Sequence, residues 1–354
     1  MADMRRLLLI AAGLVVISLF GLGSIVAFSR ITDFELPKIA QQTVSFSDSG
    51  NRLEGTLITA SVDGPTVLLV HDDGAQDRWS ADGYLPLVNT LLDAGISVFS
   101  WDKPGVGAST GNWLHQSMTD RANETVAALT AVRQVAGFQD RTIGLLGFSQ
   151  AGWVLPRVPA LTDDASFLVL MGGAINWQAQ GRYYATIRLT REGQTSAQIA
   201  AELLRQAQEQ REWFGSDATY ADYRAARRPE NGFSSADRFR FAQLNYREDA
   251  RDSIAKLTLP VLVLSGAEDL NVDPQDTIAV YTQLLKAVHP LSAFHLVPNA
   301  THSLMSASYP NYQRPDQIPL MAQARFILAG RNAYEGDVLK TVTDWIFDVS
   351  RAAP

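Results

Sequence analysis

Short apolar runs recur along the chain after residue 40, and polar stretches long enough to form helices separate them. Continuous apolar runs of this kind are typical of strands buried on both faces of a parallel sheet. Alternation with helices predicts an α/β fold in which a mostly parallel sheet is covered by helices on both faces. The predicted strands are residues 67–70, 96–100, 142–146, 166–171 and 259–265, and the predicted helices include 82–94 and 117–136.

Two segments depart from this alternation. Residues 42–60 contain the turn sequence Asp48-Ser49-Gly50-Asn51, which predicts a β-hairpin. Residues 176–250 are rich in Gln, Arg, Glu, Ala and aromatic residues. We expect them to form a helical cap inserted into an α/β core made of residues 42–175 and 251–354, at the sheet edge where such folds bind ligands. The alternative is a solvent-exposed helical excursion without a function.

The N-terminal residues have the pattern of a membrane-targeting segment. Arg5 and Arg6 precede 22 uncharged residues, 7–28, which is enough for one helix to cross a bilayer. With basic residues before the run and acidic residues after it, we expect residues 1–30 to be a transmembrane anchor and 31–41 a linker. The domain would then lie on the extracytoplasmic, periplasmic side. The alternative is a cleaved signal peptide, which would release the exported domain.

Composition narrows the possible chemistry. The 354 residues are 46% hydrophobic, enough for a sizeable core, and the formal net charge is −7. Without a long basic run, this charge argues against nucleic acid as a partner. The absence of cysteine excludes cysteine nucleophiles, disulfides and thiolate-bound metals. Residues 105–111 lack the glycine spacing of a nucleotide-binding loop, and the adjacent side chains of residues 71–73 cannot all face one ion. We therefore expect neither a cofactor nor a metal.

Ser149 is the candidate nucleophile. It lies in the sequence LLGFSQAGW, residues 145–153, where a predicted strand ends and a helix is expected to begin near Gln150. Small residues two positions to either side, Gly147 and Ala151, permit the sharp strand-to-helix turn that exposes a nucleophilic serine. The alternative is an unreactive serine that caps a helix.

A serine nucleophile needs a base, and the base needs an acid that orients it. In this architecture the acid and then the histidine follow the serine along the chain. His302 lies in a loop after a strand-like run and is the candidate base, whereas we interpret His289 and His295 as structural. Asp269 follows the preceding strand and is the candidate acid. For the oxyanion we expect the backbone amides of Gln150 and Asp73.

Five segments occur in the order found in α/β-hydrolases: LLVHDDGAQDR, SWDKPGVGASTG, GFSQAGW, GAEDLNV and NATHS. Over residues 42–350 the chain resembles the bacterial serine hydrolases near the S33 serine aminopeptidase and dienelactone hydrolase families. The resemblance implies an eight-stranded, mostly parallel sheet and a triad of Ser149, Asp269 and His302. Most proteins of this branch look like esterases.

Three positions differ from the pattern of those families. Asp72 replaces the glycine that usually follows His71, so two carboxylates lie beside the expected oxyanion hole. Their charge would oppose the oxyanion unless a cation neutralises it, and Arg78 is the nearest candidate in the sequence. Pro104 replaces an arginine, and Ala151 replaces a glycine.

Taken together, these features predict an exported hydrolase that cleaves carboxylic esters or related acyl bonds of a small-molecule substrate through an acyl-enzyme on Ser149. Trp177, Tyr183 and Tyr184 in the cap are candidates to line an acyl pocket. One alternative is an S33-type exopeptidase, for which the sequence identifies no acid that would bind a free N-terminus. The other is a non-catalytic domain that binds a ligand or a partner, and the intact triad argues against it.

Overall fold

The computed structural model describes residues 32–226, 233, 235–285, 289–308 and 311–352. These residues contain one eight-stranded sheet with the order β1-β2-β4-β3-β5-β6-β7-β8. The first two strands form the predicted hairpin, β2 also pairs antiparallel with β4, and the remaining neighbours are parallel. The predicted fold class is therefore confirmed. The strands are β1 (Gln41–Asp48), β2 (Asn51–Ile58), β3 (Thr66–Val70), β4 (Ser97–Trp101), β5 (Ile143–Phe148), β6 (Leu168–Met171), β7 (Val261–Gly266) and β8 (Ala293–Val297).

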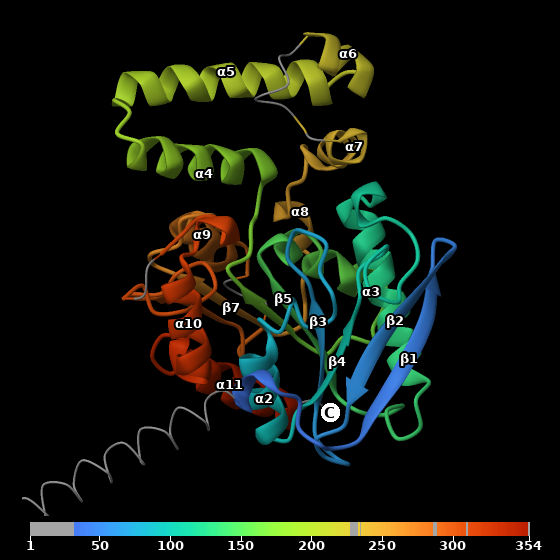
Figure 1. Ribbon diagram of the computed structural model, residues 1–354. Helices are drawn as coiled ribbons and strands as arrows, with labels where there is room; N and C mark the ends of the chain where they lie inside the picture. The colour runs from blue at the N-terminus through green and yellow to red at the C-terminus, as the bar shows by residue number, and fades with distance from the viewer. Residues whose placement is uncertain (1–31, 227–232, 234, 286–288, 309–310, 353–354) are drawn as a thin grey trace, which may run out of the picture.

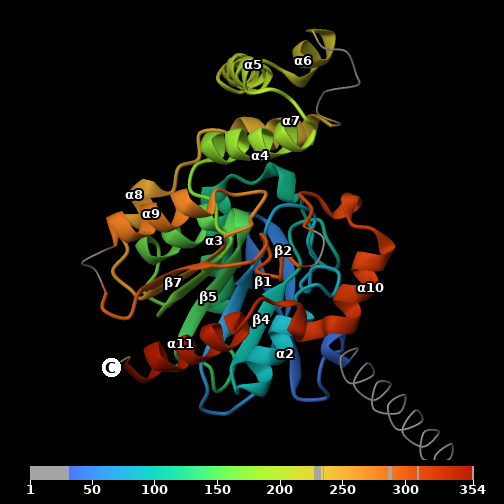
Figure 2. The same ribbon diagram turned by 90° about the vertical axis from the view of Figure 1, so that its left-hand side faces the viewer.

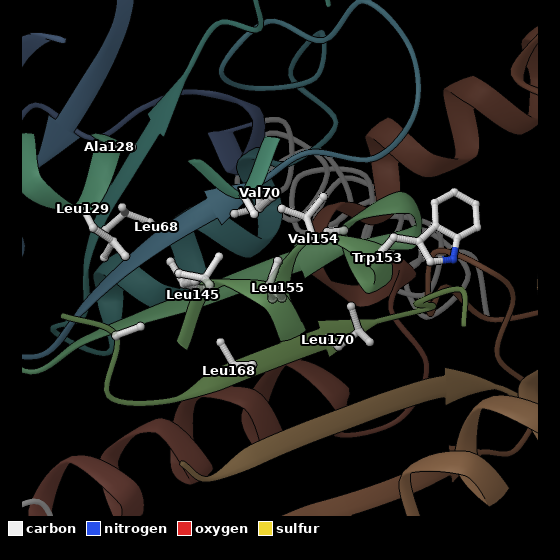
Figure 3. Packing of buried hydrophobic residues seen from close by; sticks show 14 of the residues in the cluster. Leu68, Val70, Ala128, Leu129, Leu145, Trp153, Val154, Leu155, Leu168 and Leu170 are labelled. Carbon is white, nitrogen blue, oxygen red and sulfur yellow. The ribbon is translucent and has the colours of Figure 1, made fainter. Parts of the chain in front are cut away.

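Two hydrophobic clusters pack on opposite faces of the sheet, which explains why the central strands are apolar throughout. In β3, Leu68 and Val70 belong to the cluster under α3 (Met118–Arg133) and α9 (Pro274–Leu284), part of which Figure 3 shows. Val67 and Leu69 belong to the cluster under α2 (Leu85–Asp93) and α11 (Val338–Ala352). Each residue of the strand is thus buried on one side or the other.

Between β6 and β7 the described chain contains α8 (Arg251–Ile254) and, before it, four helices that Figures 1 and 2 show beyond one edge of the sheet. These four are α4 (Trp177–Arg191), α5 (Ser196–Phe214), α6 (Tyr220–Ala226) and α7 (Ala236–Asn245). The side chains of Asn176, Thr195 and Ser235 accept hydrogen bonds from backbone amides and so cap α4, α5 and α7. Outer helices pack on each other through aromatic rings that include Phe214, Tyr223 and Phe239. We propose this segment, residues 176–250, as the cap.

The chain after Ser149 does not form the α-helix that the sequence suggests. It forms two short 3-10 helices, η3 (Ser149–Trp153) and η4 (Leu155–Ala160). Pro156 and Pro159 lack the amide hydrogen that an α-helix would need at these positions. The short helices of the remaining chain are η1 (Thr32–Phe34), η2 (Trp113–His115), α8 (Arg251–Ile254), η6 (Pro315–Gln317), α10 (Leu320–Ala329) and η7 (Gly330–Ala333).

The predicted anchor, residues 1–30, lies outside the described residues. Among the helices that the structure does describe, none is both long and apolar enough to cross a membrane. The described chain begins at η1, where both the backbone amide and the guanidinium of Arg331 donate to the Asp33 carboxylate, at 2.9 and 2.8 Å. The first described residues are therefore bonded to the domain through Asp33.

Candidate active site

The candidate nucleophile occupies a strained turn at the carboxyl end of β5. Ser149 has a φ of 47°, in the left-handed region that residues other than glycine seldom adopt. Position 147 must be small, because a Cβ on Gly147 would lie 2.5 Å from the Cβ of Ala151. The amide of Ala174 donates to the Ser149 carbonyl at 3.1 Å. The backbone around Ser149 therefore has the geometry of a nucleophile elbow.

The structure brings Asp269 and His302, the predicted acid and base, into contact. The Nδ1 atom of His302 lies 2.7 Å from Oδ2 of Asp269. The other carboxylate oxygen accepts from the amides of Asn271 and Val272, at 2.7 and 3.0 Å. Burial by itself would lower the pKa of His302, but the charge and hydrogen bond of Asp269 outweigh it and raise that pKa above its ordinary value. With Nδ1–H donating to Asp269, Nε2 is left to accept a proton.

Gly172 brings the serine turn and the histidine to the same edge of the sheet. Phe148 pairs with Met171 in the β5–β6 ladder, so Ser149 and Gly172 leave neighbouring strands side by side. A methyl group on Gly172 would lie 2.7 Å from the carbonyl oxygen of His302 and 3.2 Å from its Nδ1. Among the described residues no hydrogen bond joins the Ser149 hydroxyl to His302. In enzymes without substrate this contact is often long and closes in the reactive complex.

The two residues expected to form the oxyanion hole also lie together. The Gln150 side-chain amide donates to Oδ1 of Asp73 at 3.1 Å. The backbone amide of Gln150 lies in the first turn of η3, where amides have no partner within the helix. The Asp73 carboxylate is held from the cap side by Arg238 of α7, at 2.6 and 3.1 Å.

The cations around this loop are not the one that the sequence suggested. Arg78 instead pairs with Asp102 and Glu54, at 2.6 and 3.2 Å. Its position is explained by the strand order, in which β4 lies between β2 and β3 and brings Asp102 beside Arg78. The prediction that Arg78 neutralises the carboxylates is therefore wrong.

Two buried cations from other elements hold the loop. Lys103 donates to the carbonyl oxygens of Asp72 and Gly74, the latter at 3.0 Å. Arg121 of α3 donates to the His71 carbonyl at 2.8 Å and to the side-chain oxygen of Gln150. Together with Arg238, these residues surround the loop with positive charge. Sequence reasoning missed all three.

The two carboxylates respond differently to these surroundings. Burial raises the pKa of Asp72, although the charge of Lys103 opposes the rise. Burial would also raise the pKa of Asp73, but the hydrogen bonds and charge of Arg238 outweigh it and lower that pKa. The pKa of Lys103 falls to about 7 because of burial and the nearby Arg121. Burial therefore disfavours the charged form of Asp72, whereas Arg238 stabilises the charged form of Asp73.

Three of the other four histidines make polar contacts outside the candidate triad. His71 is buried with its Nε2 atom 2.6 Å from the Trp101 carbonyl oxygen, and burial followed by the charge of Lys103 lowers its pKa to about 3. A neutral His71 thus donates to Trp101 and ties the loop after β3 to β4. His115 pairs with Asp237 at 2.9 Å, and the amide of Leu291 donates to His289 at 3.2 Å. His295 lies within β8.

The cap contacts both loops that carry the candidate site. The Tyr183 hydroxyl donates to the Asp269 carbonyl at 2.7 Å, and the Gln180 side chain donates to the Asn271 carbonyl at 3.1 Å. Trp177 packs against Trp153, which lies near the end of η3, with ring centroids 5.2 Å apart. Among the residues the structure describes, no three His, Asp or Glu side chains gather where they could hold a metal ion.

The chain matches one family model, and many solved structures share its fold. The model of the family described as serine aminopeptidase, S33, matches residues 66–307. No curated protein matches the chain. Among solved structures, an esterase from Pyrococcus furiosus is 16% identical with a TM-score of 0.54, covering 75% of this chain and 84% of that one.

Two further structures show the same similarity. A thermophilic esterase from Thermogutta terrifontis is 19% identical with a TM-score of 0.50, covering 88% of this chain and 99% of that one. A 2,6-dihydroxy-pseudo-oxynicotine hydrolase is 15% identical with a TM-score of 0.52, covering 89% and 70%. At such low identity these similarities show a common fold.

Proposed function

We infer the function of this protein from two premises: the chain belongs to the serine aminopeptidase S33 family of α/β-hydrolases, and its candidate triad lies at one edge of the sheet. The protein is a serine hydrolase, and we propose that it cleaves carboxylic esters. The observation that carries the assignment of residues is the 2.7 Å contact between His302 and Asp269 beside the strained turn of Ser149.

In the proposed reaction, the Ser149 hydroxyl attacks the ester carbonyl while Nε2 of His302 takes its proton. The amides of Gln150 and Asp73 donate to the oxyanion that forms. His302 then gives the proton to the leaving alcohol as the carbon–oxygen bond breaks, which leaves an acyl group on Ser149. Water, deprotonated by the same imidazole, attacks the acyl carbonyl and releases the carboxylic acid. Asp269 keeps the imidazole in the required tautomer throughout.

The charges beside the site favour an ester over a peptide with a free N-terminus. An exopeptidase needs an ionised carboxylate to bind the terminal ammonium group. Of the two carboxylates next to the proposed hole, Asp73 is already paired with Arg238 at 2.6 Å. Burial raises the pKa of the other, Asp72. Asp73 therefore offers no unpaired carboxylate to an incoming ammonium group, and burial disfavours the charged form of Asp72 that such binding would need.

Matched substrates test this assignment. The purified protein would be assayed with p-nitrophenyl esters of increasing acyl length and with amino-acid p-nitroanilides, beside a Ser149→Ala control. We expect ester hydrolysis that the control lacks. Faster cleavage of the anilides would favour the exopeptidase, and no cleavage of either class would favour a non-catalytic domain. The acyl length that gives the highest kcat/KM would report on the cap, which we propose sets specificity.

We also propose that residues 7–28 anchor the protein in a membrane with its domain on the extracytoplasmic side. The support is the length of the uncharged run and the charges that flank it. Extraction of membranes with alkaline carbonate followed by intact-mass analysis tests this. An anchored protein stays in the membrane with residues 1–30 attached, whereas a cleaved signal leaves a soluble protein that begins near Ser29.

A further inference from the structure

Helix α10, Leu320–Ala329, presents a row of large apolar side chains to the solvent. Of the nine large hydrophobic residues that are exposed in the described chain, four belong to this helix. The exposed fractions are 81% for Leu320, 76% for Met321, 44% for Ile327 and 48% for Leu328. The other five are spread over separate elements, as is usual for single exposed residues. Four exposed apolar side chains on one helix are typical of a surface that contacts a partner or a membrane.

These side chains lie on one face of the helix. Positions 320, 321, 324, 327 and 328 follow the spacing of a single helical stripe, and Ala324 in the middle of it is also exposed. The opposite face packs on the domain, with Ala329 buried and Phe326 half-buried. We name the first face, residues 320, 321, 324, 327 and 328, the outer face of α10. The outer face is apolar although the opposite face of the helix already packs on the domain.

The N-terminal chain reaches the domain beside this helix. Phe34 of η1 stacks edge-to-face on Phe326, with ring centroids 5.1 Å apart. The side chain of Asn89 donates to the carbonyls of Asp33 and Glu35, at 2.8 and 2.9 Å. Arg331, the second residue of η7 and two positions after the end of α10, holds the Asp33 carboxylate at 2.8 Å. Figure 2 shows α10 beside the dark-blue start of the described chain. Residues 33–35 are thus fixed next to α10.

The tether between the proposed anchor and this fixed point is short. The uncharged run ends at Phe28, and η1 begins at Thr32. A fully extended chain spans at most about 3.6 Å per residue, so the end of the run lies within roughly 15 Å of η1. If residues 7–28 span the bilayer, as proposed above, its surface must lie close to α10.

We propose that the outer face of α10 lies in the interface of the bilayer that holds residues 7–28. This inference rests on the proposed membrane anchor. The apolar face of a ten-residue helix binds lipid weakly alone, but a short tether gives it a high effective concentration at the surface. Because the outer face of α10 carries no charged side chain, we expect the contact to be apolar and insensitive to salt. Docking would fix how the domain sits on the membrane.

That orientation bears on the candidate site. The segment between His302 and α10 is bonded to the cap and to the acid loop: Gln313 donates to the carbonyls of Tyr184 and Leu270, at 3.0 and 2.8 Å. Arg191 of α4 donates to the Asn311 carbonyl at 3.2 Å. A docked α10 would therefore hold the cap side of the site at a set height above the lipid.

The absence of cysteine makes site-specific labelling straightforward. Full-length Ala324→Cys would be labelled with an environment-sensitive nitrobenzoxadiazole probe and reconstituted into phosphatidylcholine vesicles. The matched control is Leu204→Cys on α5 of the cap, whose native side chain is 72% exposed. We expect blue-shifted emission at position 324 that a lipid-borne quencher reduces, no shift at 204, and no change in 0.5 M salt.

A third protein tests whether the outer face is the cause. In the Ala324→Cys background, Leu320→Gln and Ile327→Gln should return the emission to that of the position 204 control. These side chains are exposed, so the fold should tolerate the changes. Unshifted emission at 324 in vesicles would overturn the inference. A shift that needs no vesicles and grows with protein concentration would also overturn it, in favour of a second copy of the chain.

Flotation separates this inference from the proposals on which it rests. If the labelled proteins fail to float with vesicles, the anchor itself is refuted, and the docking of α10 with it. If they float but position 324 is unshifted, only the docking is refuted. Hydrolysis of a soluble ester, measured on the same samples, reports on the catalytic proposal independently.

Discussion

The contact between Arg238 of the cap and Asp73 gives a quantitative prediction. In Arg238→Gln the Asp73 carboxylate loses hydrogen bonds of 2.6 and 3.1 Å and the charge that lowers its pKa. The carboxylate stays ionised at neutral pH unless its pKa rises by several units. Its negative charge is then uncompensated beside the backbone amide that we propose holds the oxyanion. The oxyanion should become harder to form.

The expected size follows from Coulomb's law. An oxyanion held by the amide of residue 73 would lie about 5 Å from the carboxylate of the same residue. At that distance two unit charges repel by about 1 kcal/mol in water and about 3 kcal/mol at an effective dielectric constant near 20. The Asp73 side chain is 44% exposed, which favours the lower part of this range. A cost of about 1–2 kcal/mol corresponds to a loss of about 5–30-fold in kcat/KM. Most of the loss should fall on kcat, because the charge develops in the transition state.

A double-mutant cycle identifies the cause. Arg238 also packs over the rings of Phe241 and Trp113, at 5.0 and 5.5 Å from their centroids, so its loss could instead loosen the cap. Adding Asp73→Asn removes the uncompensated charge, and the double variant should recover to the level of Asp73→Asn alone. A double variant as slow as Arg238→Gln would refute the electrostatic reasoning. Arg205→Gln, which removes a cap arginine that pairs with Glu202 and Glu209 on its own helix, is the matched control and should keep parental activity.

Three further predictions concern the triad. Asp269→Asn should lower kcat by about 10³–10⁴-fold, because the imidazole loses the partner that fixes its tautomer; a loss under tenfold in ester turnover would contradict the assignment. The pKa of His302 is raised from 6.5 and only the neutral imidazole accepts a proton, so kcat/KM should fall as the pH drops through a value above 6.5; an acid limb below 6.5 in the pH–rate profile would contradict this. Gly172→Ala places a methyl group 2.7 Å from the His302 carbonyl oxygen at a φ of +62°, so we expect a large loss of kcat with a small decrease in Tm. A lowered Tm with unchanged kcat would refute the proposed placement.

The strands and the residues of the candidate triad were predictable for one physical reason. Strands buried on both faces are apolar throughout, so their ends are visible in the sequence. The polar residues that follow those ends, Ser149 and Asp269, could therefore be placed at one edge of the sheet. The 3-10 geometry after Ser149 was also predictable in principle, since Pro156 and Pro159 are incompatible with an α-helix there.

The charged surroundings of the site were harder to predict. Arg121 lies on the buried face of α3, with Met118, Ala122 and Thr125. A charge on an apolar helical face is a signal of a buried ionic site that the sequence does contain. The contact between Arg238 and Asp73 joins residues that are 165 positions apart, and no local pattern indicates it. Arg78 was wrongly chosen because it is near in sequence, whereas the strand order directs it to Asp102.

The central claim is that Ser149 is an activated nucleophile, and covalent labelling tests it most directly. The full-length protein and a Ser149→Ala variant would be treated with a fluorophosphonate and their intact masses compared, without knowledge of the natural substrate. The account predicts one adduct on the parent protein, at Ser149, and none on the variant. A folded parent that gains no adduct, or an adduct that persists in the variant, would contradict it.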